Sequence, residues 1–430
     1  MANLSNNKNL GAGRTGQAEA PTCVASADET KTNNAGKKIK VLMIAPTPFF
    51  ADRGCHVKIL EEVRALSRRN IDVKVVTYHI GRNIEGVDIQ RIVNIPWYKK
   101  LEAGPSIHKY YLDLLLAFKA IKVAARFKPD IIHAHLHEGV FAGKIVQLFI
   151  RKPLIADYQG SMVGEMLDHG FMKRNSFPYR FNSWLERTVN KWPQKIIFSS
   201  SGAKEFFLAN FNVNPEKVVS FVEGTNTDEF HPGYDTSRLR ERLNLPGGKK
   251  IVIYLGVLTK YQGVDILIDS INDVKSKFND VHFLIVGFPN LEYYTEMAQK
   301  LGVSDWVTFT GRVNHEDVPK YLNLADIGVS LKLSKTEANG KLFGYMAVGL
   351  PCLVFDTKTN KEILGDTGIY ADYNSKESFV EKLIFLLENE KIAKEYGRIA
   401  RLRVLEKYTW DNTFSNFIDI YKDVLQKSKS

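Results

Sequence analysis

One segment of the chain combines residue types that bind anions at the start of a helix. The strand DIGVSL precedes SKTEANGKLFGYMAVGLP, where the backbone amides of Gly340, Lys341 and Leu342 are unpaired donors suited to a phosphate. Lys341 adds a positive charge, and Glu337 before the turn can accept hydrogen bonds from sugar hydroxyls beside that phosphate. The alternative is an ordinary strand-to-helix turn in which the glycine relieves strain and the lysine is solvated.

Two further groups lie where strands are expected to end. Gly54, in TPFFADRGCH, can present its amide to a phosphate or a sugar, or it can simply form a tight loop. In PDIIHAHLHEG, the residues His133, His135 and His137 alternate, which places them on one face of a strand and could suit a metal. Because no cysteine or carboxylate cluster accompanies them, we favour substrate positioning or proton transfer. Buried histidines bonded to the backbone are the alternative.

These residues need a scaffold of parallel strands. Apolar runs such as KKIKVLMIAP, IDVKVVTYH and DIIHAH alternate with helical patterns at 56–69 and 106–127, and a second series runs from KKIVIYLG to PCLVF. Strands that alternate with helices predict parallel α/β sheets, because a helix is the usual crossover between parallel strands. A Pro- and Gly-containing stretch at 232–248 predicts a linker between two doubly wound domains. In such sheets ligands bind outside the carboxyl ends of the strands, so we expect the site in the cleft between the domains.

Composition agrees with this organisation. The chain has 430 residues, of which 44% are hydrophobic and 25% charged, as expected of a soluble chain with two or three domains. Its 3 cysteines lie far apart, so a disulfide framework and a zinc site are both disfavoured. We expect a disordered tail at 1–36, a first domain at 37–235, a second domain at 236–405 and a C-terminal helix at 406–430.

Several ordered motifs resemble the GT-B glycosyltransferases, and specifically the retaining family 4 of the group 1 type. They are VLMIAPTPFFADRGCHVKILEEVRAL, PDIIHAH, VEGTNTDEFHP, YLGVLTKYQGVDILIDSI, VTFTGRVNHEDVPKYLNLADIGVSL and EANGKLFGYMAVGLPCLVFD. The resemblance implies two Rossmann-like domains, the first binding the acceptor and the second binding a nucleotide-sugar, with the C-terminal helix returning to the first. It also implies metal-independent transfer with retention of anomeric configuration.

The resemblance assigns roles to individual residues. Glu337 matches the first glutamate of the family's E-x7-E motif, which contacts the donor sugar, and His135 matches the cleft histidine; these two are the candidate catalytic residues. The candidates for donor binding fall in three places. Gly340, Lys341 and Leu342 match the helix start that receives the diphosphate. Arg312 and Val313 match the segment that holds the base, and Gly54 matches the glycine loop over the phosphates. His137 and Gln159 are candidates for acceptor binding.

Two departures from the family's motifs each replace one residue that makes a contact. The second glutamate of E-x7-E, eight residues after Glu337, is Tyr345, which we keep as a donor-binding candidate. The family's T-x-H-G appears as ADYQG, with Gln159 where histidine is usual.

A third departure from the family's motifs removes two positive charges. The Arg and Lys that clamp the diphosphate in the family's G-R-L-x-x-x-K-G pattern are Val257 and Gln262 in GVLTKYQG. Such a clamp commonly does much of the catalytic work. We therefore expect Lys260 and Lys341 to replace it, in a divergent subgroup with altered donor contacts; an inactive member is the alternative.

The net charge of +11 is concentrated in the first half, where residues 37–235 carry 29 basic and 20 acidic side chains. Two stretches there, starting at NIPWYKK and DHGFMKR, combine aromatic and basic residues, which suits contact with anionic lipid. The residues concerned are Trp97, Tyr98, Lys99, Lys100, Lys109, Lys119, Lys122, Arg126, Phe171, Met172, Lys173 and Arg174. The alternative is that Leu112, Leu115 and Leu116 are core positions and the lysines are merely solvated.

The sequence thus predicts an enzyme that moves a sugar from a nucleotide-diphosphate donor to a hydroxyl acceptor, a glycan or a lipid-linked glycan. We expect no metal cofactor and no nucleic-acid partner. A cytoplasmic location is expected, and a peripheral position on the inner face of the membrane is a hypothesis. A catalytically inactive GT-B binding subunit and a nucleotide-sugar epimerase on the same fold are the alternatives.

Overall fold

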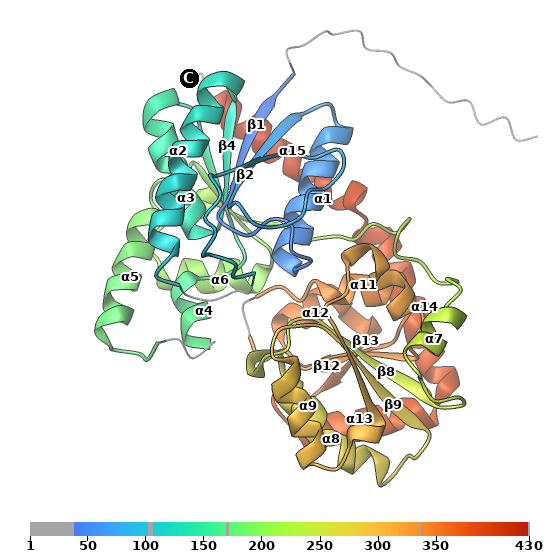
Figure 1. Ribbon diagram of the computed structural model, residues 1–430. Coiled ribbons are helices and arrows are strands. Elements are labelled where there is room, and N and C mark those ends of the chain that lie inside the picture. The colour runs from blue at the N-terminus through green and yellow to red at the C-terminus, as the bar shows by residue number, and fades with distance from the viewer. Residues whose placement is uncertain (1–37, 102–105, 169–171, 335–336, 429–430) are drawn as a thin grey trace, which may run out of the picture. The chain divides into compact units, whose positions relative to one another are not determined.

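The computed structural model describes residues 38–101, 106–168, 172–334 and 337–428, and Lys38–Ser430 form one compact unit (Figure 1). The tail expected at 1–36 lies outside the described residues. Within them, two sheets hold strands that all pair in parallel, which confirms the predicted pair of parallel α/β domains.

The first sheet has the order β3-β2-β1-β4-β5-β6-β7 and the second the order β10-β9-β8-β11-β12-β13. The strands of the first sheet are β1 Lys40–Ala45, β2 Asp72–Thr77, β3 Asp88–Arg91, β4 Ile131–His135, β5 Leu154–Tyr158, β6 Lys195–Phe198 and β7 Val218–Ser220. Those of the second are β8 Lys250–Leu255, β9 Val281–Val286, β10 Val307–Gly311, β11 Ile327–Ser330, β12 Cys352–Phe355 and β13 Gly368–Ala371.

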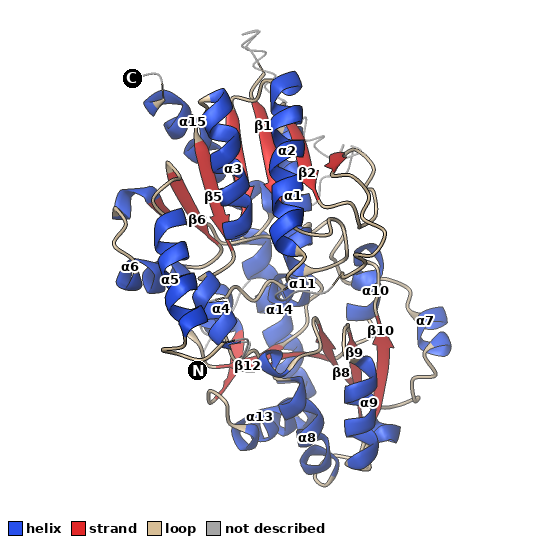
Figure 2. Ribbon diagram, turned by 60° about the vertical axis from the view of Figure 1, so that its left-hand side comes forward, coloured by secondary structure: helices blue, strands red, loops and turns tan. Residues whose placement is uncertain are grey.

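Helices cover both faces of the strands (Figure 2). This arrangement explains the continuous apolar runs, because every residue of β4, β5 and β9 is buried. The helices before the linker are α1 Gly54–Arg68, α2 Lys109–Phe127, α3 Leu136–Ile150, α4 Met162–Asp168, α5 Phe177–Val189 and α6 Ser201–Asn210. The later ones are α7 Ser237–Arg242, α8 Val264–Lys275, α9 Leu291–Lys300, α10 Val318–Leu322, α11 Lys341–Ala347, α12 Lys358–Leu364, α13 Lys376–Glu388, α14 Glu390–Lys407 and α15 Trp410–Lys427.

The last helix packs on the first sheet although it ends the chain. Phe414, Phe417 and Tyr421 of α15 are fully buried in a cluster with β1 and α1, and Figure 1 shows α15 beside them. As a result, the buried surface of α1 is wider than the apolar stripe that its sequence predicts. Lys58 and Glu62, which that stripe leaves out, are buried as well.

The strand orders locate the functional edge of each sheet. Each order reverses at a central pair, β1 with β4 in the first sheet and β8 with β11 in the second. In doubly wound sheets ligands bind outside the carboxyl ends of the strands at such a reversal. The segments that leave these strands carry Gly54, Gln262 and Glu337, and His135 is the last residue of β4.

Candidate active site

Glu337 forms an ion pair with Lys332, which lies two residues after the end of β11. Lys332 Nζ lies 2.7 Å from Glu337 Oε2 and donates a hydrogen bond to the Ala338 carbonyl oxygen at 2.8 Å. The two charged side chains are only 8% and 14% exposed, so the contact is shielded from water. A charge-assisted bond of this kind fixes the direction of the Glu337 carboxylate.

Lys341 extends from the first turn of α11 toward the loop between β8 and α8. Its Nζ donates to Gln262 Oε1 at 3.1 Å and lies 4.2 Å from the ring centre of Tyr254. A Cβ atom on Gly256 would lie 2.9 Å from that nitrogen, so the glycine makes room for it. Burial, with Lys332 nearby, holds the pKa of Lys341 well below its usual range. An anionic ligand would therefore stabilise the ammonium form here.

Glu223 approaches the same helix start from the first half of the chain. It follows β7, and a Cβ atom on Gly340 would lie 3.3 Å from Glu223 Oε2. Burial raises the pKa of Glu223, although Lys58 and a hydrogen bond with Ser199 oppose the shift. A carboxyl group with a raised pKa can stay protonated and donate a hydrogen bond to an anion instead of repelling it.

An ionic cluster fixes the loop that carries Gly54. Asp52 accepts from Arg82 at 2.7 Å and from Arg312 at 2.8 Å, and its Oδ1 also accepts from the backbone amide of His315 at 3.1 Å. Burial raises the pKa of Asp52, but the two guanidinium groups outweigh it and hold the pKa below its usual range. The Arg312 side chain is therefore engaged in joining the segment after β10 to the loop after β1. Gly54 has open space where a Cβ would stand.

Beneath this edge lies a buried group of charged and histidine side chains. Lys58 Nζ contacts Asp157 Oδ1, donates to Ser199 Oγ at 3.0 Å and lies 3.7 Å from Glu62 Oε1. His133 and His135 stack at 4.5 Å between ring centres, and His133 Nε2 is 3.5 Å from Asp157 Oδ2. Burial raises the pKa of Asp157, but Lys58 and the histidines outweigh it and lower the pKa.

This cluster offers ligand-type atoms from Glu62, His133, His135 and Asp157 within 4.8 Å of one another. The Lys58 ammonium already contacts the carboxylates, and a divalent cation would bring its charge against that ammonium. We therefore interpret Lys58 as the counter-charge of the cluster.

Sequence comparison covers both halves of the chain. Residues 53–229 match the family model described as Glycosyltransferase Family 4, and residues 235–403 match the model described as Glycosyl transferases group 1. The chain belongs to the group 1 glycosyltransferases.

Known glycosyltransferases share its length and fold. An uncharacterized glycosyltransferase of Methanocaldococcus jannaschii is 22% identical over 404 residues, which are 90% of this chain and 99% of that protein. The sucrose-phosphate synthase of Thermosynechococcus elongatus superposes with a TM-score of 0.77 at 16% identity, over 91% of this chain and all of that one. Anabaena HepE in complex with UDP and glucose gives a TM-score of 0.73 at 15% identity, over 90% and 100%. The GT-B fold expected from the motifs is confirmed.

Within this group 1 glycosyltransferase, three predicted site residues have surroundings that differ from those expected. His135 is 1% exposed and turned into the interior, because residues two apart on β4 face α1 and α15 together. His137 is buried against Tyr158, with 3.9 Å between ring centres. Lys260 is 76% exposed and extends to Asp265 on α8, at 3.9 Å. Contact of these three side chains with a ligand stays a prediction.

The other predicted site residues lie at the start of α11, after β10 and after β5. Gly340 and the buried Leu342 frame the start of α11 beside Lys341, and the partly buried Val313 packs against the apolar cluster that includes β8 residues. The Leu342 amide donates to the Asn339 carbonyl oxygen at 3.0 Å, so the expectation that this amide is unpaired is wrong. Gln159 follows β5 and is half-buried.

Tyr345 is buried and bonded to two strands of the second sheet, and its assignment to the donor stays a prediction. Its hydroxyl accepts from the Leu255 amide at 2.8 Å and donates to the Val329 carbonyl oxygen at 3.3 Å. A Cβ atom on Gly328 would lie 2.6 Å from the Tyr345 ring, so β11 has a glycine where the ring packs. The ring is fully buried and joins α11 to the two central strands.

This geometry predicts the effect of Tyr345→Phe. The change leaves the Leu255 amide without its acceptor, so the free energy of unfolding should fall by about 1–3 kcal/mol. Urea denaturation measures the loss, with Tyr293→Phe on the exposed face of α9 as the control. Turnover should stay within about twofold, since the hydroxyl does not face the site. Loss of turnover at unchanged stability would contradict this structural role.

Sequence reasoning missed Lys332, Glu223 and Lys58. Lys332 stands two residues after β11, and Glu223 lies in VEGTNTDEFHP, so both occupy the strand ends where a site was expected. Lys58 carried a different signal, because a lysine and two glutamates interrupt the otherwise apolar helix VKILEEV. Glu223 and Lys58 became interpretable only once their partners across the fold were known, and Lys332 once its ion pair with Glu337 was known.

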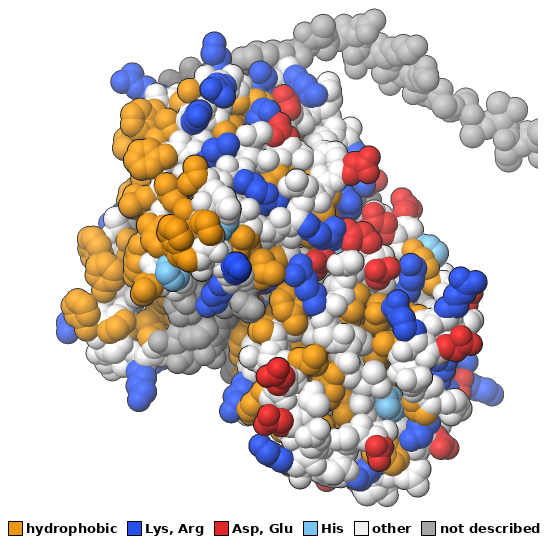
Figure 3. All heavy atoms as spheres, in the orientation of Figure 1, with side chains coloured by type: hydrophobic (Ala, Val, Ile, Leu, Met, Phe, Trp, Pro, Cys, Tyr) orange, Lys and Arg blue, Asp and Glu red, His pale blue; other side chains and the backbone are white. Residues whose placement is uncertain are grey.

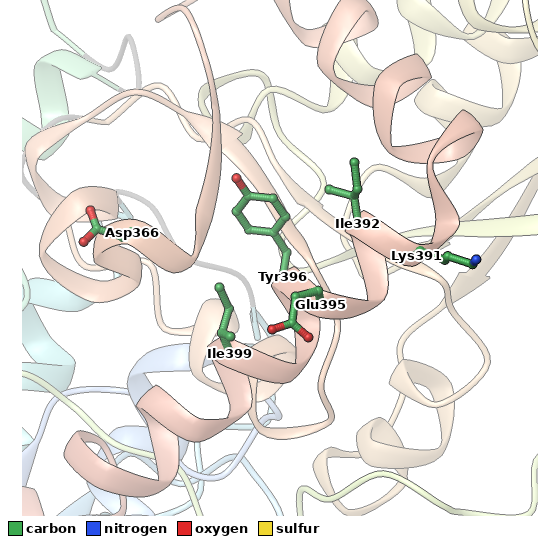
Figure 4. A pocket seen from close by; sticks show the side chains of 6 residues that line it. All are labelled: Asp366, Lys391, Ile392, Glu395, Tyr396 and Ile399. Atoms are coloured by element: carbon green, nitrogen blue, oxygen red, sulfur yellow. The ribbon is translucent and has the colours of Figure 1, made fainter. Parts of the chain in front are cut away.

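A hollow beside α14 lies apart from these residues. It has a volume of about 360 Å³ and is lined by Asp366 and by five side chains along α14, namely Lys391, Ile392, Glu395, Tyr396 and Ile399 (Figure 4). None of the predicted site residues lines it. Separately, no helix among the described residues has the length and apolar character needed to cross a bilayer.

Proposed function

We propose that the protein transfers a sugar from a nucleotide-diphosphate donor to a hydroxyl acceptor, a glycan or a lipid-linked glycan, with retention of configuration and without a metal ion. The observation that carries the proposal is the placement of Lys341, Lys332 and Glu337 at the carboxyl edge between β8 and β11. Anabaena HepE, which shares the fold, was solved with UDP and glucose. Glu337 would contact the donor sugar, and Lys341 would lie beside the diphosphate.

In this reaction the bond between the sugar carbon and the diphosphate oxygen breaks, and its electron pair leaves with the nucleoside diphosphate. The acceptor oxygen forms the new bond, and its proton passes to the diphosphate or to solvent. Negative charge grows on the diphosphate, so a cation fixed beside it lowers the barrier. Lys341 supplies that cation through its contact with Gln262, the residue that replaces the family's clamp lysine.

An inactive binding subunit is the second candidate, because Val257 and Gln262 remove two cations from the clamp. The contact of Lys341 Nζ with Gln262 argues against an inactive subunit, because Lys341 can supply a positive charge to the loop that lost the clamp residues.

Binding is tested by a thermal-shift panel of uridine, guanosine and adenosine diphosphate sugars. A ligand that binds only the folded state raises the melting temperature, so we expect at least one donor class to do so. The shift should be lost in Lys341→Met and kept in Lys260→Met. A panel in which no nucleotide-sugar shifts the wild type would contradict the proposal.

A further inference from the structure

Three neighbouring helices of the first domain carry large apolar side chains that face solvent. Tyr110, Leu114 and Phe118 lie on α2, Phe141, Leu148 and Phe149 on α3, and Phe177, Phe181 and Trp184 on α5. These nine residues, which we name the α2–α3–α5 face, are each between 39% and 81% exposed. Figure 3 shows hydrophobic side chains gathered over these helices.

The exposed residues are arranged in stripes. Tyr110, Leu114 and Phe118 are four residues apart, and Phe177, Phe181 and Trp184 are four and three apart, so each set follows one side of its helix. The opposite side of α2 is core, since Leu112 and Leu116 are fully buried. The sequence expectation that these leucines are core positions is therefore correct, and a different side of the helix carries the exposed apolar groups. Helix α3 contacts both α2 and α5, so the stripes are neighbours.

The second domain lacks a comparable face among its described residues. Its exposed large apolar side chains are one each on α9, on α13 and in the loop after β13, and Ile392, Leu402 and Leu405 on α14. Single exposed apolar residues are ordinary, whereas a contiguous set marks a binding surface.

Charge around the α2–α3–α5 face has one sign. Between 97 and 191, every described charged residue that is exposed is Lys or Arg. They are Lys99, Lys122, Arg126, Lys128, Arg151, Lys173, Arg174, Arg180, Arg187 and Lys191. Two acidic groups on these helices are engaged in the fold: the half-buried Glu138 accepts from Lys109 at 2.9 Å, and the buried Glu186 accepts from the amides at the start of α4.

We propose that the α2–α3–α5 face docks on the surface of an anionic lipid bilayer. Aromatic side chains that enter the interface and basic side chains that meet anionic headgroups are the two components of peripheral binding, and both occur on the same helices. A second copy of the chain fits less well, because a twofold contact would set like positive charges against each other. The structure also refines the residues expected from sequence, since Tyr98 is buried and Lys109 is paired with Glu138, while Phe171 lies outside the described residues.

The inference goes beyond the proposed reaction, because lipid binding is measured without donor or acceptor. The full chain is sedimented with vesicles of phosphatidylcholine, with and without phosphatidylglycerol, at low and high salt. We expect binding to the anionic vesicles that weakens as salt rises. Arg180→Glu with Arg187→Glu should weaken it at least tenfold, given about fivefold for each positive charge removed. Phe118→Ser with Trp184→Ser should weaken it roughly tenfold.

Phe385→Ser with Leu402→Ser, at exposed positions on α13 and α14, is the matched control and should bind as the wild type does. All variants change exposed residues, and melting temperatures check that they fold. Absence of binding to anionic vesicles at low salt would overturn the proposal. So would equal binding to neutral vesicles, or a wild-type dimer that the Phe118→Ser, Trp184→Ser variant dissociates.

Discussion

Replacing Lys341 with methionine should lower kcat/KM for sugar transfer by roughly 10²–10³-fold, the loss seen when one group that stabilises developing charge is removed. Methionine keeps much of the length of the side chain and removes only the ammonium. The Lys341 nitrogen is positioned by Gln262 Oε1 at 3.1 Å and lies 4.2 Å from the centre of the Tyr254 ring. Steady-state kinetics measures the loss, and the melting temperature shows whether the variant folds.

Lys260→Met is the matched control, because Lys260 belongs to the same loop but is largely exposed and extends to Asp265. Its kcat/KM should stay within about twofold. An equal loss in the two variants would contradict the assignment of Lys341 as the clamp cation.

The lowered pKa of Lys341 adds a pH dependence. Burial favours its neutral form in the empty site, and a bound diphosphate favours the ammonium, so binding takes up a proton. Above about pH 7, where phosphate ionisation is complete, affinity for a nucleoside diphosphate should therefore fall as the pH rises. Lys341→Met should bind more weakly and lose most of that dependence.

Lys58→Met should have the largest effect on stability, a decrease of about 3–5 kcal/mol in the free energy of unfolding. The change leaves Asp157 and Glu62 buried without the ammonium that contacts the first and lies 3.7 Å from the second. Burial already raises the pKa of Glu62, so part of the cost is met by protonation of the carboxyl groups. Urea denaturation followed by circular dichroism measures the difference.

Lys320→Met is the comparison for an exposed ion pair, since Lys320 lies 3.2 Å from Asp317 at the surface of α10. It should cost no more than about 1 kcal/mol. Adding Asp157→Asn to Lys58→Met should recover part of the stability, because the unpaired charge is removed. If Lys58→Met were no less stable than Lys320→Met, the buried pair would not be the counter-charge that we infer.

Much of the fold could be predicted because parallel sheets with both faces covered leave continuous apolar runs, as in β1, β4 and β9. The strands that pattern reasoning missed are short or polar. DIQR of β3 is half-exposed or exposed throughout, and VVS of β7 has three residues, so neither has the apolar length that marks a strand.

The site was predictable where the signal is local. Glu337, Gly340 and Lys341 occupy one strand-to-helix segment, and the structure keeps them together. Glu223 depends on a contact across the fold with the start of α11, and spacing in the sequence does not encode it. Lys332 pairs with Glu337 within one loop, and no pattern in that loop indicated the pair. The position of His135 at a strand end was visible in the sequence, whereas its burial beside Glu62 and Asp157 was not.

Turnover of a nucleotide-sugar at Glu337 and Lys341 is the reaction to be measured. The donor class that shifts the melting temperature is incubated with the wild type and with Glu337→Ala, together with a mixture of glycan and glycolipid hydroxyl acceptors. Phosphorus NMR follows the nucleoside diphosphate. We predict that the wild type releases nucleoside diphosphate, and that Glu337→Ala binds the donor but releases at least 10²-fold less. A donor that binds both proteins and stays intact with both would contradict the account and assign the chain as a binding subunit.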